Sequence, residues 1–118
     1  MEEKFKVELL EEAVKFLDQV DKKAREKIIY NLWKARVVTD RELFKKLNGE
    51  IWEFRTLHKK THYRLLAFWD KSSKVDTVVI STHGIVKKTS KVPQSEIDKA
   101  ERIRKKYFEQ KSKRDEDI

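Results

Sequence analysis

The chain contains no cysteine, one proline and only two glycines among its 118 residues. Without cysteine, disulfides and thiolate-bound metal sites are excluded, and a reducing compartment is favoured. The sequence also lacks a glycine-rich phosphate loop, an HExxH motif and a nucleophile elbow. We therefore expect neither a cofactor nor a bound metal ion.

Long apolar segments are missing as well. No run of about 18 apolar residues occurs, so we expect no membrane span. The N-terminal stretch MEEKFKVELLEEAVKF mixes charges of both signs with apolar residues, unlike a secretory signal. These features predict a soluble, cytoplasmic protein. A chain of this length usually forms one domain, which we assign to residues 1–110, with a disordered tail at 111–118.

Positive charge is abundant. The chain carries 29 Lys and Arg against 21 Asp and Glu, for a formal net charge of +8. Such a surface suits a polyanion, which could be nucleic acid, an anionic membrane or an acidic protein. Charge alone does not choose among these partners.

Two stripes of apolar residues at helical spacing predict a pair of helices after a short strand at 4–9. The first stripe consists of Ala13, Phe16, Leu17 and Val20. The second stripe consists of Ala24, Ile28, Leu32 and Ala35. Asp21 lies just before the second helix as a favourable N-cap, so the two helices should form a tight hairpin.

After the turn signal Asn48-Gly49, β-branched and aromatic residues predict three strands. They are EIWEFRTLHK (50–59), YRLLAFWD (63–70) and VDTVVISTH (75–83). Their short links predict an antiparallel meander. A helix at 95–110, capped by Ser95, completes an α+β fold of order β-α-α-β-β-β-α, with the helical hairpin and the C-terminal helix packed on an antiparallel sheet.

Strand alternation identifies a candidate site. Glu53 and Arg55 share one face of their strand, opposite the aromatic Phe54, which should enter the core. Arg64 lies in the next strand and His83 ends the third. Together the four polar residues could surround one ligand with a carboxylate, two guanidiniums and an imidazole.

Such a set suits RNA cleavage without a metal ion. The 2′-hydroxyl must lose a proton, the phosphorane needs cationic donors, and the leaving 5′-oxygen must gain a proton. His83 could transfer protons near neutral pH, and Arg55 and Arg64 could bind phosphate oxygens. Three lysines that follow the last strand would strengthen the field at the phosphate. They are Lys87, Lys88 and Lys91.

Each residue also has a simpler interpretation. Glu53, Arg55 and Arg64 could form exposed cross-strand ion pairs, each worth under about 1 kcal/mol. His83 could be a capping or surface histidine, and the three lysines could belong to a solvated loop. His62, at a hairpin link, fits solvent exposure better than zinc binding, because no third ligand is apparent nearby.

Three motifs resemble the RelE/ParE superfamily of bacterial type II toxins, most closely its HigB-like, phage-related branch. They are LNGEIWEFR (47–55), YRLLAF (63–68) and HGIVKKTSKVPQSEIDKAERIRKKY (83–107). The last motif is the most specific, with a glycine after the third strand, paired lysines, a proline and a basic helix.

The resemblance implies an α+β ribonuclease that enters the ribosomal A site, cuts mRNA and is held inactive by an antitoxin, usually a helix-turn-helix protein. Arg55 and Arg64 resemble the family's phosphate-binding residues, and His83 lies near the strand end that supplies catalytic groups. Many members place a catalytic tyrosine after the last strand. This chain has HGIVKKT there, which leaves Tyr63 and Tyr107 as the nearby substitutes.

Two other classes of function remain open. One is a non-catalytic superfamily member that acts on gyrase or binds only its antitoxin. The other is a basic nucleic-acid-binding accessory domain. Because Arg64 is assigned to an exposed face, we expect Arg64→Ala to abolish toxicity and to leave the fold intact.

Overall fold

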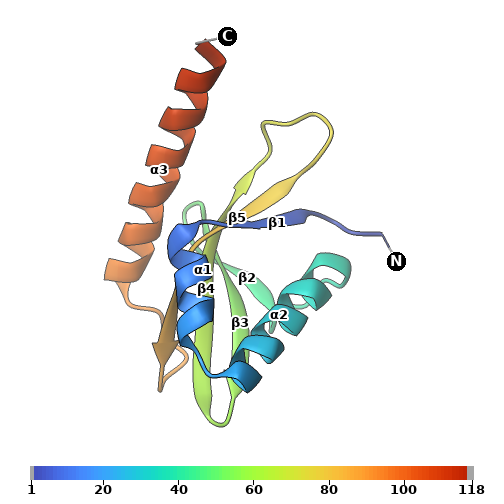
Figure 1. Ribbon diagram of the computed structural model, residues 1–118, viewed down its shortest axis with the longest axis vertical. Helices are drawn as coiled ribbons and strands as arrows, with labels where there is room; N and C mark the ends of the chain where they lie inside the picture. The colour runs from blue at the N-terminus through green and yellow to red at the C-terminus, as the bar shows by residue number, and fades with distance from the viewer. Residues whose placement is uncertain (1, 117–118) are drawn as a thin grey trace.

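The computed structural model describes residues 2–116, which form a five-stranded sheet with helices on both faces (Figure 1). The elements in chain order are β1 (Lys6–Leu9), α1 (Glu11–Gln19), α2 (Lys22–Val37), β2 (Phe44–Asn48), β3 (Ile51–His58), β4 (Thr61–Asp70), β5 (Val78–Lys87) and α3 (Gln94–Glu116). The strand order across the sheet is β1-β5-β4-β3-β2.

The α+β class is confirmed, but two features of the sheet differ from the prediction. Residues 44–48 form an additional strand, β2, which pairs antiparallel with β3, so the predicted order lacked one strand. β1 pairs parallel with β5, so the sheet is mixed rather than antiparallel. The segment FKKLN carries too few apolar residues to indicate a strand by itself, and its pairing with β3 decides its conformation.

The N-terminal helical hairpin is confirmed and covers one face of the sheet. The carboxylate of Asp21 caps α2 by accepting hydrogen bonds from the backbone N–H groups of Lys23 and Ala24, at 3.4 and 3.2 Å. All four residues of the second predicted stripe are buried. The two helices pack on apolar residues of the central strands, which include Phe54, Leu65, Ala67 and Val79.

Helix α3 covers the opposite face, where Ala100 packs with Leu66, Phe68 and Ile80. It begins at Gln94, one residue before the predicted cap Ser95. The Pro93 carbonyl accepts hydrogen bonds from the backbone N–H groups of Glu96 and Ile97. Proline is well suited to the start of a helix, so the helix can begin directly after Pro93.

The same helix is longer than expected and does not cover the whole face. It continues to Glu116, so residues 111–116 of the expected tail are helical, and residues 117–118 lie outside the described part. Figure 1 shows α3 running upward, away from the β3–β4 hairpin at the bottom of the view. The end of the sheet near that hairpin is therefore left without a helix on the α3 side.

An irregularity in β5 changes which face His83 occupies. Leu66 pairs with His83 whereas Ala67 pairs with Ser81, so Thr82 is an extra residue in the strand. Simple alternation would place His83 with Ser81, but the bulge moves it to the opposite face, which is the α3 side. The next residue, Gly84, then faces α1, where a Cβ atom would lie 2.2 Å from Cδ2 of Phe16.

Among residues 2–116, no helix is both long enough and apolar enough to cross a membrane.

Candidate active site on the open end of the sheet

Glu53 and Arg64 form a buried ion pair at the centre of the site. Both side chains are only 2% exposed, and Oε1 of Glu53 lies 2.7 Å from Nε of Arg64. Both atoms lack a well-directed hydrogen bond, so the contact is an ion pair whose N–H does not point straight at the oxygen. The partners come from β3 and β4, and both project toward the α3 side.

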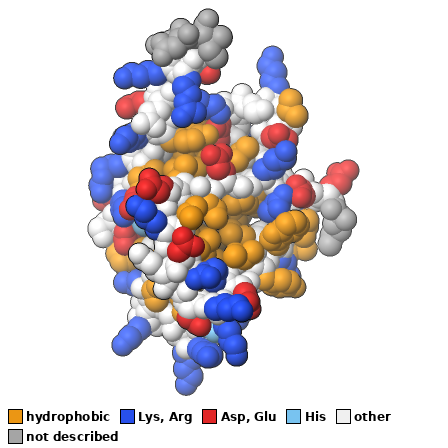
Figure 2. All heavy atoms as spheres, viewed as in Figure 1, with side chains coloured by type: hydrophobic (Ala, Val, Ile, Leu, Met, Phe, Trp, Pro, Cys, Tyr) orange, Lys and Arg blue, Asp and Glu red, His pale blue; other side chains and the backbone are white. Residues whose placement is uncertain are grey.

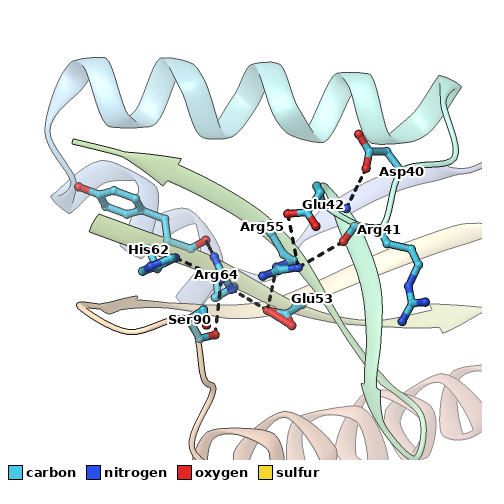
Figure 3. Close-up of polar contacts among 9 residues, drawn as sticks. Asp40, Arg41, Glu42, Glu53, Arg55, His62, Arg64 and Ser90 are labelled. Carbon is cyan, nitrogen blue, oxygen red and sulfur yellow. Dashed lines mark hydrogen bonds and ion pairs between the residues drawn. The ribbon is translucent and has the colours of Figure 1, made fainter. Parts of the chain in front are cut away.

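Arg55 approaches the same carboxylate from β3 (Figure 3). Its Nε lies 4.0 Å from Oε1 of Glu53, and this buried nitrogen has no hydrogen-bond partner. Its Nη1 lies 3.5 Å from the Arg41 carbonyl oxygen and 4.0 Å from a carboxylate oxygen of the exposed Glu42. Two guanidiniums therefore share one buried carboxylate, and donor capacity is left unused.

The remaining nitrogens of Arg64 connect the pair to the surface. Nη1 donates to the Tyr63 carbonyl at 3.1 Å, and Nη2 lies 3.5 Å from the Ser90 carbonyl. Nη2 also lies 3.4 Å from Nδ1 of His62. A hollow of about 80 Å³ opens beside these groups, with room for one small anionic group. It is lined by Glu42, Arg55, Thr56, Leu57, His62 and Arg64.

The electrostatics of the site favour an anion. Burial raises the pKa of Glu53 above its usual value, against the opposing effects of Arg64, Arg55 and Lys45. Burial likewise lowers the pKa of Arg64. Lys45 is the cross-strand neighbour of Glu53 in β2 and faces the same side. The site thus holds three cations around the buried carboxylate of Glu53 and the exposed carboxylate of Glu42.

His83 is on the same face but not in the same site. It pairs with Leu66, which in turn pairs with Glu53, so roughly 10 Å, two strand spacings, separate His83 from Glu53. Its Nδ1 lies 2.8 Å from Oγ1 of Thr82, and its Nε2 lies 3.3 Å from Oε1 of Glu96 in α3. Both ring nitrogens are thus occupied where α3 begins.

The pKa of His83 is consistent with that enclosed position. Burial lowers it from its usual value, Lys99 acts in the same direction, and Glu96 opposes them. We therefore expect a neutral imidazole at pH 7. The structure brings Glu53, Arg55 and Arg64 together, and it does not bring His83 to them.

A comparison with known protein families identifies the family of the chain. Residues 15–105 match the family described as Phage derived protein Gp49-like (DUF891). The chain belongs to this Gp49-like family. The family is part of the RelE/ParE-like toxin superfamily, so the resemblance found in the motifs is confirmed at the level of the superfamily. Comparison with curated proteins gave no match.

In this Gp49-like protein, His62 occupies the position near the arginines that was expected for His83. It lies two residues before Arg64 on the same strand, and strand alternation therefore places both on one face. That spacing was visible in the sequence, but the hairpin position of His62 suggested exposure. Lys45 was missed because its strand was not predicted.

The other candidate residues are dispersed. Tyr63 packs with the cluster under α1 and α2, and Tyr107 donates its hydroxyl to Asp70 at 2.6 Å, so neither tyrosine enters the hollow of the Gp49-like site. Lys87 is the cross-strand neighbour of His62. The remaining two lysines, Lys88 and Lys91, are exposed in the segment that leads to α3.

The premise that Arg64 lies on an exposed face, from which an intact fold was expected for Arg64→Ala, is wrong. Arg64 was assigned to an exposed face, but the segment containing Ser90 and the neighbouring strands bury it. Removing it would leave Glu53 as an uncompensated buried charge. In the Gp49-like fold, Arg64 is therefore expected to contribute to stability.

Proposed function

We propose that this protein is the toxin of a type II toxin–antitoxin system, of HigB-like type, and that it cleaves mRNA on the ribosome. The observation that carries the proposal is the pair of guanidiniums that share Glu53 beside the hollow. The pair leaves a local excess of positive charge in a desolvated place. The family and the net charge of +8 support the same conclusion.

The arginines bind and stabilise the scissile phosphate in this proposal. Arg55 and Arg64 both line the hollow, and Arg64 offers the Nη2 that faces His62. As the 2′-oxygen attacks phosphorus, negative charge grows on the non-bridging oxygens, and fixed cationic donors stabilise it strongly where water is largely excluded. Glu53 holds both guanidiniums in place, so little reorganisation is needed.

Proton transfer is assigned to His62. The imidazole accepts the proton of the 2′-hydroxyl as the 2′-oxygen bonds to phosphorus, and the bond from phosphorus to the 5′-oxygen breaks. The 5′-oxygen takes a proton from water at the open side of the hollow. The products are a 2′,3′-cyclic phosphate and a 5′-hydroxyl. His83 then has a structural role beneath α3, where it contacts Thr82 and Glu96.

The proposed partners follow from this activity. They are mRNA in the ribosomal A site and an antitoxin of helix-turn-helix type that holds the toxin inactive, all in the cytoplasm. Lys87, Lys88 and Lys91 would contact the RNA backbone next to the hollow, because Lys87 neighbours His62 across the strands.

The test is to incubate the purified protein with ribosomes that translate a defined mRNA and to map the 5′ ends. We expect cuts within the A-site codon, and none in the same mRNA without ribosomes. Arg55→Gln should slow cleavage by about 10²–10³-fold, the usual effect of removing one donor to a transition-state oxyanion. Arg102→Gln, an exposed change of equal charge on α3, should have no effect.

Intact mRNA in the presence of the wild-type protein would reject the nuclease proposal. Double-strand DNA breaks on expression, with mRNA unchanged, would instead indicate the gyrase-directed class.

A further inference from the structure

The turn between β3 and β4 has an unusual backbone. His58 pairs with Thr61, so the loop has two residues, Lys59 and Lys60, and their φ angles are 49° and 65°. Positive φ at both positions is typical of a type I′ turn, which strongly favours Asn-Gly. In the neighbouring β2–β3 turn, the residue with a positive φ is a glycine, Gly49, at 55°.

Lysine is poorly suited to this conformation, because its Cβ approaches the following carbonyl oxygen in the left-handed region. Nothing nearby compensates. Both side chains are exposed, and among residues 2–116 neither ammonium group makes a hydrogen bond or an ion pair. The pKa of Asp21 is lowered mainly by the hydrogen bond from the backbone N–H of Ala24. Lys59 contributes to this lowering only a smaller, longer-range attraction. Folding stability therefore gives no reason for two lysines here.

The position of the turn suggests a reason. On the α3 side of the sheet, Arg55 and Arg64 form one cross-strand pair, and Lys87 neighbours His62 in the next pair on this face. The turn follows directly, about 13 Å from Arg64 at the usual rise of a strand. In Figure 2, Lys and Arg side chains gather at the lower end of the molecule, where Figure 1 shows the β3–β4 hairpin.

We propose that Lys59 and Lys60 form a second phosphate-binding site, which holds the backbone of the single-stranded RNA that enters the hollow. The ligand is the ribose-phosphate chain, with no preference for base, because two ammonium groups at a turn contact charge rather than base edges. This inference rests on the proposed function, since it assigns the same RNA strand to both sites. In this proposal the lysines place charge where the strand passes, at a cost in turn geometry.

The inference predicts an opposite effect of one variant on stability and on binding. Lys59→Asn/Lys60→Gly supplies the residues that the turn prefers, and it should raise the Tm by about 5 °C. The same variant should bind RNA about tenfold more weakly at low salt. The slope of log K against log salt should become shallower by about 1.4, which corresponds to two lost phosphate contacts on a single strand.

The probe is a fluorescent, 2′-O-methylated RNA of about 12 nucleotides, which cannot be cleaved through its 2′-oxygen. Lys59→Gln/Lys60→Gln should lose the same affinity without the gain in Tm. Lys105→Gln/Lys106→Gln, which removes the same charge from exposed positions on α3, should bind like the wild type. Unchanged affinity in both turn variants, or an equal loss in the α3 control, would overturn the inference. An unchanged Tm in Lys59→Asn/Lys60→Gly would contradict the premise that lysine is poorly suited to this turn.

Because the probe is not cleaved, the binding result is independent of the nuclease proposal. Loss of affinity in the turn variants with no cleavage by the wild type would leave the RNA site standing and reject the nuclease. Cleavage by the wild type, with unchanged RNA affinity in the turn variants, would support the nuclease and reject the RNA site at the turn.

Discussion

Two buried carboxylates on the same face of the sheet have opposite surroundings. Asp70, near the end of α3, is 3% exposed and accepts four hydrogen bonds from three residues. The donors are the backbone and hydroxyl of Ser72, the Tyr107 hydroxyl and the Lys111 ammonium group. Glu53, on the open end, is equally buried but has ion-pair contacts without a well-directed hydrogen bond.

The pKa values reflect this difference. Burial alone would raise the pKa of Asp70, but the hydrogen bonds from Lys111, Ser72 and Tyr107 outweigh burial and hold it well below its usual range. For Glu53, burial prevails over the arginines and raises the pKa. The saturated carboxylate of Asp70 anchors a helix, whereas Glu53 leaves donor capacity unused on the arginines beside it.

Arg64→Ala is the change that most disturbs the open end. It leaves Glu53 buried without its closest partner, so we expect a loss of about 3–5 kcal/mol in the free energy of unfolding, together with loss of cleavage. Urea denaturation measures the first effect. Replacing both partners, as in Glu53→Met/Arg64→Met, should destabilise the fold much less than the single change. Equal losses in the single and double variants would mean that the pair is not coupled.

Substituting each of the two histidines, His62 at the open end and His83 under α3, distinguishes the roles of these two regions. His62→Gln should slow mRNA cleavage by about 10²–10⁴-fold, the usual contribution of a general acid or base. His83→Gln should change cleavage by less than about tenfold and lower stability instead, because its partners are structural. End mapping and thermal melting of both variants provide the measurement. A larger catalytic defect in the His83 variant would return proton transfer to that residue.

Asp70→Asn tests the anchor of α3. Losing the charge-assisted hydrogen bonds from Lys111 and Tyr107 should lower the free energy of unfolding by about 2–3 kcal/mol. Cleavage per folded molecule should stay unchanged, because the hollow lies at the other end of the sheet. Asp18→Asn, an exposed change of the same kind, should fall within about 0.5 kcal/mol of the wild type. Reduced cleavage at full folding would show that the two ends are coupled.

The difference in stability between the wild type and Asp70→Asn should also depend on pH, and this is a smaller effect with a definite direction. The pKa of Asp70 is lower in the folded state than its usual 3.8, so its stabilisation is present above pH 3.8 and is lost as the pH falls below that value. The advantage of the wild type over Asp70→Asn should therefore shrink progressively in acid, as measured by urea denaturation from pH 5 to about pH 2.5. A constant difference would contradict the assigned pKa shift.

Local patterns predicted much of the fold. The stripes that begin at Ala13 and Ala24 recur every three or four residues, so they indicate helices without knowledge of the rest of the chain. The polar segment 44–48 has no such signal, because its conformation depends on hydrogen bonds to β3. The predicted start of α3, with Ser95 as the cap, differs from the observed start at Gln94 by one residue, since either Pro93 or Ser95 is reasonable at a helix start.

The candidate site was predicted only in part, for a related reason. Alternation correctly put Glu53 and Arg55 on one face, but burial was judged from residue type, and both Glu53 and Arg64 are covered. Alternation in β5 predicts the wrong face for His83, because the bulge at Thr82 shifts the register and no local sequence pattern indicates that bulge. Alternation alone favours His83 as the histidine near the arginines, whereas the structure has His62 there.

The sequence by itself determined the helices, four of the five strands, the excess of positive charge and the family motifs, because each depends on residue identity or on neighbours a few positions apart. Only the tertiary structure decided how β2 pairs, which histidine lies beside the arginines and how deeply the Glu53–Arg64 pair is buried. These depend on strand register and on the coverage of the sheet by α3, which arise from contacts between segments far apart in the chain.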